Sequence, residues 1–174
     1  MDLDLATDLL RRTPTVLEAQ LSGLPQAVLD QSFGEGWMSP RATVAHFIEG
    51  ERQDWIPRTL MILEHGPSRP FIPFDPHSMY SWLGSKSVEG LIIEFAQLRT
   101  ENLQKLEQLQ LKPADLDKPG RHPEFGEVSL EQLLSTWVVH DHYHLAQIYK
   151  ALAHFNEAEI GPWKQYLSFI YNPA

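Results

Sequence analysis

The sequence predicts an all-α protein built as a four-helix bundle, and three observations support this fold class. Four segments carry apolar residues at the three- and four-residue spacing of one helix face. Prolines, glycines and polar residues separate these segments. No segment alternates apolar and polar residues over a length that would make a useful strand. Helices with one apolar stripe each bury it against one another, which gives a bundle.

The first helix is expected over residues 2–22, where leucines recur at helical spacing as far as Leu21. Pro14 interrupts this pattern, and a proline inside a helix removes a backbone hydrogen bond. We therefore expect either one helix with a kink or two pieces, ending at Gly23.

The second helix is expected over residues 40–64. Ser39 can cap it, and Pro40 suits the first helical position, where the missing N–H would be unpaired anyway. Pro57 lies inside the segment and is expected to bend the helix. The predicted inward stripe is polar around His46 in its first half and apolar in its second: Ala42, His46, Glu49, Gln53, Ile56, Leu60 and Leu63.

A long crossover is expected over residues 66–86. It is rich in prolines and aromatic residues, and the aromatic rings favour burial, so we expect an ordered segment rather than a flexible linker. The third helix follows over residues 87–111, with the clearest apolar stripe of the chain. Residues 112–128 are expected to form a polar loop.

The fourth helix is expected over residues 129–154. Ser129 and Gln132 have the spacing of a capping box at its start. Gly161-Pro162 then begins a short C-terminal helix. The whole chain, residues 1–174, is predicted to form one bundle domain.

The composition narrows the functional classes. The net charge of −9 argues against a nucleic-acid partner and against an anionic membrane surface, because both attract clustered Lys and Arg. No apolar run is long enough for a membrane span, and the acidic first residues do not resemble a signal peptide, so we expect a cytoplasmic protein. There is no cysteine, so a transition-metal site must use His, Asp or Glu, which favours zinc, nickel, iron or manganese.

The fourth helix carries the strongest functional signal. His140 and His144 lie one turn apart on one helix face, close enough for both imidazoles to bind one metal ion. A third ligand is needed, and His46 lies on the inward stripe of the second helix. Three neutral imidazoles with an open position are typical of a catalytic metal site. The alternative is that these histidines are structural residues with hydrogen-bond partners in the core.

Three further polar residues are candidates for catalysis. Asp141 lies in the middle of the apolar stripe, where it either orients a ligand imidazole or pairs with a core Tyr, Trp or Arg. Glu49, one turn after His46, is a fourth ligand, a general acid–base, or a partner of a nearby Gln or Arg. Gln147, one turn after His144, is placed to touch a bound ligand.

The order and spacing of several short motifs resemble the DinB-like (YfiT-like) metalloprotein superfamily over most of the chain. These motifs are Trp37-Met-Ser-Pro-Arg-Ala-Thr-Val-Ala-His46, Asp54-Trp-Ile-Pro-Arg58, Thr136-Trp-Val-Val-His140-Asp-His-Tyr-His144-Leu-Ala-Gln-Ile148 and Gly161-Pro-Trp163. The resemblance implies an up-down-down-up bundle with a long crossover, often dimeric. It also implies a metal triad at His46, His140 and His144.

The resemblance further implies a divalent ion, zinc or nickel first, and a small-molecule substrate. Our leading hypothesis is a thiol-dependent S-transferase or isomerase in which the metal binds a low-molecular-weight thiol that attacks a small electrophile. A metal-dependent hydrolase with a metal-bound water as nucleophile is the first alternative. A non-catalytic metal-binding module of a stress response or of protein interactions is the second. We also expect a homodimer, from the resemblance alone.

Overall fold

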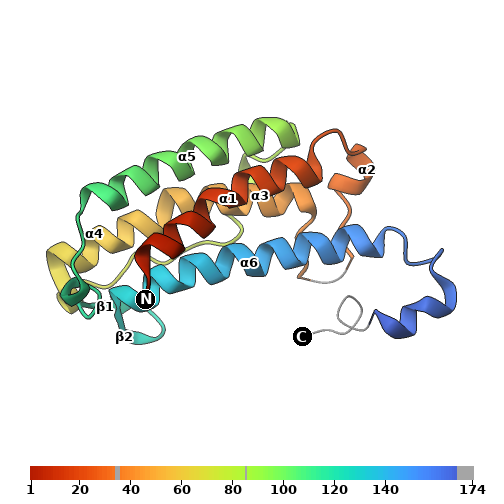
Figure 1. Ribbon diagram of the computed structural model, residues 1–174. Coiled ribbons are helices and arrows are strands. Elements are labelled where there is room, and N and C mark those ends of the chain that lie inside the picture. Colours follow the sequence, from red (N-terminus) through yellow and green to blue (C-terminus); the bar gives the residue numbers. More distant parts are fainter. Residues whose placement is uncertain (34–35, 85, 168–174) are drawn as a thin grey trace.

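The computed structural model describes residues 1–33, 36–84 and 86–167, and its long helices form a four-helix bundle (Figure 1). The α-helices are α1 (Leu3–Leu21), α2 (Gln26–Leu29), α3 (Pro40–Gln53), α4 (Trp55–His65), α5 (Val88–Gln108) and α6 (Leu130–His154). Four short 3-10 helices are η1 (Gly66–Ser68), η2 (Ser78–Ser81), η3 (Pro113–Asp115) and η4 (Gly161–Tyr166). The strands β1 (Pro119–His122) and β2 (Gly126–Ser129) form an antiparallel hairpin. Within the described ranges, no helix is both long and apolar enough to cross a membrane.

The helices run up-down-down-up, as the family resemblance implied. In Figure 1, α1 and α6 run in one direction, whereas α3, α4 and α5 run in the other. Hydrogen bonds join these helices near their middles: Thr13 on α1 donates to Asp141 on α6, and Arg99 on α5 donates to the Leu10 carbonyl on α1. The crossover between α4 and α5 carries the chain back along the bundle, so that two consecutive long helices point the same way.

The predicted helix starts are confirmed by their caps. The Ser39 hydroxyl accepts a hydrogen bond from the Ala42 N–H, and Pro40 is the first residue of α3. At the start of α6, the Ser129 hydroxyl accepts from the Gln132 N–H while the Gln132 side chain accepts from the Ser129 N–H, which completes the capping box. Pro14 lies within α1, which is one continuous helix rather than two pieces.

The second predicted helix is broken rather than bent, and the break lies before Pro57. α3 ends at Gln53 and α4 begins at Trp55, four and two residues ahead of that proline. A proline ring clashes with the carbonyl of the residue four positions earlier, which explains why α3 stops at Gln53. The break also shifts the phase of α4, so Leu60, predicted to face inward, is 45% exposed. The residues that α4 buries are Trp55, Ile56, Arg58, Thr59 and Ile62.

The expected polar loop after α5 contains the β1–β2 hairpin, which the sequence did not indicate because each strand has only four residues. Gly120 of β1 packs so closely that a β-carbon there would lie 2.6 Å from the Ile62 side chain. The Phe71 N–H donates to the Arg121 carbonyl, so the hairpin holds the first part of the crossover.

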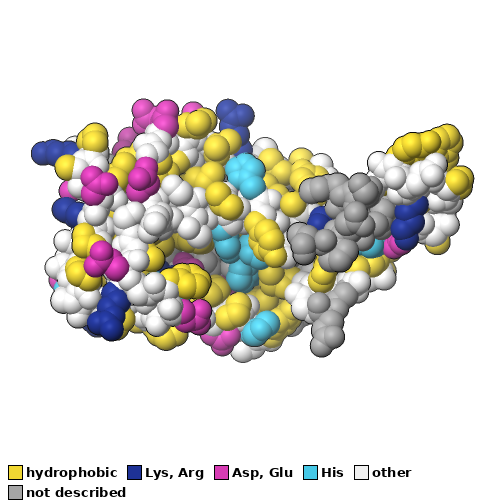
Figure 2. All heavy atoms as spheres, turned by 90° about the horizontal axis from the view of Figure 1, so that it is seen from below, with side chains coloured by type: hydrophobic (Ala, Val, Ile, Leu, Met, Phe, Trp, Pro, Cys, Tyr) yellow, Lys and Arg dark blue, Asp and Glu magenta, His cyan; other side chains and the backbone are white. Residues whose placement is uncertain are grey.

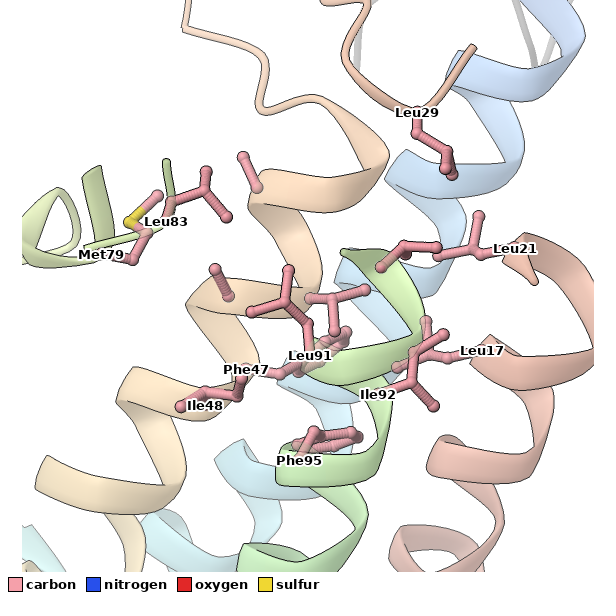
Figure 3. Packing of buried hydrophobic residues seen from close by; sticks show 14 of the residues in the cluster. Leu17, Leu21, Leu29, Phe47, Ile48, Met79, Leu83, Leu91, Ile92 and Phe95 are labelled. Carbon is pink, nitrogen blue, oxygen red and sulfur yellow. The ribbon is translucent and has the colours of Figure 1, made fainter. Parts of the chain in front are cut away.

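The apolar core has two parts along the bundle. One contains Phe47 and Phe95 and is shown in Figure 3, where its side chains from α1, α3 and α5 meet, while Met79 and Leu83 of the crossover lie beside α3. The other contains Trp55 and Trp137. Buried polar side chains lie where the two parts meet, since Arg99 covers the rings of both Phe95 and Trp137.

Candidate metal centre

The structure brings together the three histidines that the sequence singled out. His46 projects from α3, and His140 and His144 project from the antiparallel helix α6. One ring nitrogen from each of the three lies within 4.8 Å of the others. His46 Nε2 and His140 Nε2 are 3.1 Å apart, close to the roughly 3.3 Å between two nitrogens on a tetrahedral zinc ion. Among the described residues, this is the one cluster of three His, Cys, Asp or Glu side chains with that spacing.

The histidines lie at the junction of the two core parts. The Phe47 ring meets His140 and His144 edge-on, and the Trp55 ring meets His140 edge-on at a centroid distance of 5.0 Å. His46 and His144 are only 5% and 6% exposed. On the surface of the bundle seen in Figure 2, histidine side chains gather near the middle among hydrophobic side chains.

Burial keeps the three imidazoles neutral. It lowers the pKa of His46 to about 4, helped by the neighbouring His144 and opposed by a hydrogen bond with the backbone of Pro76. It lowers the pKa of His140 to about 2, with further lowering by the other two histidines and by Arg99. It also lowers the pKa of His144. The neutral imidazole is the form that binds metal ions, so the cluster is in its ligand form at pH 7.

The hydrogen bonds of the individual ring nitrogens indicate whether the cluster fits a metal. His144 Nδ1–H donates to Gln147 Oε1 at 2.7 Å, which leaves Nε2 without a proton and free to bind a cation. In the described part of the chain, the buried Nδ1 atoms of His46 and His140 have no hydrogen-bond partner of normal geometry. The two facing Nε2 atoms, 3.1 Å apart, hydrogen-bond to each other if one of them carries a proton, and they present lone pairs to each other if both protons are on Nδ1. A divalent cation between them would remove such a repulsion, so the donor set fits a divalent metal ion.

The structure places Asp141 away from the histidine nitrogens. Its carboxylate accepts two hydrogen bonds from Arg99, at 2.6 and 3.0 Å, and one from the Thr13 hydroxyl at 2.6 Å. Of the two roles considered for Asp141, the structure shows the pairing with a core arginine. The negative charge of Asp141 also opposes the lowering of the His144 pKa by burial, so Asp141 acts on the cluster through charge.

The carboxylate of Glu49 is likewise hydrogen-bonded to other side chains. One oxygen accepts from Trp82 at 2.9 Å and from Arg52, and the other accepts from Ser78 at 2.9 Å and from Gln53. The nearby Arg and Gln partners correspond to one of the roles considered above. Because Ser78 and Trp82 belong to the crossover, Glu49 fastens the crossover to α3.

The sequence reasoning did not identify the buried charges of Arg99 and Glu51. Arg99 donates to Glu51 as well as to Asp141, and Glu51 accepts further bonds from Asn102 and Trp137. Both residues are buried. Arg99 lies at stripe spacing from Phe95 and Asn102 on α5, which was a signal in the sequence, whereas Glu51 lies off the stripe predicted for the second helix. Neither position reveals which side chains pair.

The fold and the cluster define a four-helix bundle with three core histidines, and comparison with known proteins identifies its family. Residues 9–148 match the model of the DinB superfamily, and the chain belongs to that superfamily. A protein of Oceanobacillus iheyensis named "putative metal-dependent hydrolase" is 24% identical over 136 residues, which are 78% of this chain and 77% of the relative. A protein of Bacillus mycoides with the same description is 27% identical over 141 residues, 78% of this chain and 76% of the relative.

A solved structure shares the fold. It is described as "YfiT from Bacillus subtilis is a probable metal-dependent hydrolase with an unusual four-helix bundle topology". It aligns with a TM-score of 0.75 and 20% identity, covering 88% of this chain and 87% of the other. The family, the names of these relatives and the histidine cluster together support a divalent-metal-binding protein.

Proposed function

We propose that this protein is a metal-dependent hydrolase of a small molecule, with His46, His140 and His144 as the metal ligands. The observation that carries the proposal is the approach of three neutral imidazoles from two facing helices at the junction of the core. Three nitrogen ligands leave a further position on the ion for a reactant, as in catalytic rather than structural zinc sites. The names of the relatives support the hydrolytic reaction class.

The bound ion would supply Lewis-acid activation of a water or thiol and polarisation of a substrate carbonyl. The chain's own residues hold and orient it. Gln147 Oε1 accepts a hydrogen bond from His144 Nδ1–H and so fixes both the tautomer and the ring orientation of that ligand. Phe47 and Trp55 pack against the imidazoles and keep water from the inner side of the cluster.

A second candidate is transfer to a low-molecular-weight thiol, and the state of the two carboxylates favours it. Glu49 and Asp141 are the acidic residues nearest the histidines in sequence, and the oxygens of both are already bonded to other side chains. A hydrolase gains from a general base that removes a proton from water, whereas a thiol bound to a divalent ion would release its proton to solvent without one. Zinc or nickel remains the metal that we expect for either reaction.

The first test is the metal content of the tag-free protein by elemental analysis. We expect about one ion per chain in the wild type and loss of the ion in His46→Ala and His144→Ala. His142→Ala is the matched control, because His142 lies on the same helix but is exposed. A wild type that takes up neither zinc nor nickel would exclude the proposed mechanism.

The second test separates the two reactions. The loaded protein is offered small esters and amides, and separately small electrophiles, with and without a low-molecular-weight thiol. Turnover of esters or amides without thiol supports the hydrolase, and turnover of electrophiles only with thiol supports the transferase. A protein that binds metal but turns over neither set would fit the non-catalytic module. The homodimer and the cytoplasmic location stay predictions.

A further inference from the structure

The crossover places one aromatic side chain against the histidine cluster. The ring of Phe74 meets the His46 ring edge-on, with centroids 5.6 Å apart. Within Ile72–His77, Phe74 is half-buried and the other residues are exposed. Phe74 is therefore the side chain that this stretch turns toward the cluster.

The stretch around Phe74 is stiff. Pro73 and Pro76 fix their own backbone angles and restrict the residues before them to extended conformations. The Asp75 side chain accepts a hydrogen bond from the His77 N–H and so closes a local turn. Few backbone conformations remain that would carry the Phe74 ring away from His46.

Both ends of the stretch are also fastened to the bundle. At one end, Arg58 donates to the Ile72 carbonyl and the Phe71 N–H donates to Arg121 of the hairpin. At the other end, the Ser78 hydroxyl donates to the buried carboxylate of Glu49. The ring of Phe74 is thus a fixed wall beside the cluster rather than part of a mobile loop.

A second aromatic ring flanks the cluster from α6. Tyr143 meets the His144 ring edge-on at 5.0 Å and is 58% exposed. Flat apolar groups pack well against such rings, and an aromatic pair contributes about 0.5–1.5 kcal/mol beyond its buried area. Phe74 belongs to the crossover and contacts His46, whereas Tyr143 belongs to α6 and contacts His144.

The charges around the cluster favour an uncharged ligand. Besides the three histidines, the groups whose charge acts on the imidazoles are His77, at the end of this stretch, and two buried residues, Arg99 and Asp141. These two bond to each other in the core and have almost no exposure, so neither can pair with a charged group of a substrate. A charged substrate group would lose its hydration beside aromatic rings without gaining a partner.

We propose that Phe74 determines substrate specificity at this site, and that the site selects an uncharged small molecule carrying a flat apolar group beside the reacting bond. This proposal rests on the proposed metal site and adds the class of substrate to it. Phe74 acts by packing against the apolar group, whereas the histidines bind the ion. It follows that changing Phe74 alters ligand preference and leaves metal binding intact.

The test uses three probes that share one metal-binding group. Acetohydroxamic acid and benzohydroxamic acid differ only in a methyl against a phenyl group, and 4-carboxybenzohydroxamic acid adds a negative charge. Their dissociation constants for the zinc-loaded protein are measured by calorimetry. We expect the wild type to bind the phenyl compound about 2- to 12-fold more tightly than the methyl compound, the range that one aromatic contact supplies. The carboxylated compound should bind more weakly than the phenyl compound.

The variants are Phe74→Ala and Phe74→Leu, with Phe125→Ala as the control because Phe125 is an exposed ring on the β1–β2 turn. We expect Phe74→Ala to bring the phenyl-to-methyl preference close to one, Phe74→Leu to keep part of it, and Phe125→Ala to keep all of it. Elemental analysis should show the same zinc content in every variant. If Phe74→Ala does not fold, the decision rests on Phe74→Leu.

Three results would overturn the proposal, and they differ from failure of the metal site. An unchanged preference in the Phe74 variants, tighter binding of the carboxylated probe, or no binding of either uncharged probe to the zinc-loaded wild type would each exclude it while leaving the metal site standing. A wild type that holds no zinc would exclude both proposals together.

Discussion

Two polar clusters lie in the core of this bundle, and they differ in how completely their atoms are bonded. Around Arg99, the carboxylates of Glu51 and Asp141 and the guanidinium have hydrogen-bond partners on all four long elements that surround them. In the histidine cluster, the buried Nδ1 atom of His140 lacks a partner in the described structure, and the Nε2 atoms of His46 and His140 face each other at 3.1 Å. A closed network holds helices in place, whereas an incompletely bonded cluster has capacity left for a ligand.

The largest expected effect comes from breaking the closed network. Arg99→Met would leave Glu51 and Asp141 as buried charges without their cation, and loss of one partner of a buried ion pair costs about 3–5 kcal/mol. We expect urea denaturation to show a fall of this size in the free energy of unfolding. Arg11→Met, which removes an exposed pair with Asp8, serves as the control and should change stability little. Equal effects of the two substitutions would contradict the distinction.

Substituting a residue of the histidine cluster should lower metal affinity while leaving the stability of the metal-free protein unchanged or higher. His140→Leu removes one metal ligand, and we expect metal affinity to fall by more than the roughly 100-fold that loss of a ligand's hydrogen-bond partner can cost. The metal-free variant should be as stable as the metal-free wild type or more so, because the substitution removes a buried polar atom without a partner. Calorimetric zinc titration and urea denaturation of the metal-free proteins measure the two quantities. A metal-free variant that is markedly less stable would show that His140 is a structural residue.

Acidification should weaken the metal-free protein through the same cluster. The pKa of His46 is lowered to about 4 and that of His140 to about 2, so the unfolded chain takes up these protons below pH 6.5 while the folded chain does not. Protons bound preferentially by the unfolded state lower stability as the pH falls. We expect a loss on the order of 2 kcal/mol between pH 7 and pH 5.5, measured by urea denaturation at each pH. The loss should be smaller in metal-free His140→Leu, and an equal loss would assign it to other groups.

The smallest expected effect concerns the partner of one ligand. Gln147→Leu removes the acceptor for His144 Nδ1–H, and we expect zinc affinity to fall about 10-fold, the lower end for loss of such a partner. Gln147→Glu keeps an acceptor at that position and should retain the affinity. Gln104→Leu, the same substitution at an exposed position of α5, is the control. An unchanged affinity in Gln147→Leu would mean that the other contacts of His144 suffice to orient it.

The sequence predicted the helices and the histidine cluster because both depend on helical periodicity. The spacing of His140 and His144 and the inward phase of His46 are local properties, and the capping residues Ser39 and Ser129 marked the helix starts. The break at Asp54 was missed because Pro57 acts on a carbonyl one turn earlier. The hairpin was missed because four-residue strands carry too little pattern to distinguish them from a loop.

The bonding of the buried carboxylates was not predictable in the same way. Asp141 was recognised as a charge in an apolar stripe, but its partners Arg99 and Thr13 lie 42 and 128 residues away along the chain. A helical period gives the direction of a side chain and not the element that it meets. The pairing therefore emerges only when four helices are packed together.

The long separation of the two ligand-bearing helices gives the proposed ion a role in the chain's connectivity. His46 and His140 are 94 residues apart, so one ion bound to both would close a loop that contains more than half of the chain. In a chain without cysteine, such an ion is the counterpart of a disulfide. Cross-linking a loop of this span removes unfolded-state entropy equivalent to about 4–5 kcal/mol in the loop-closure model. Removal of the metal would therefore lower the stability of the fold as well as abolish the proposed activity.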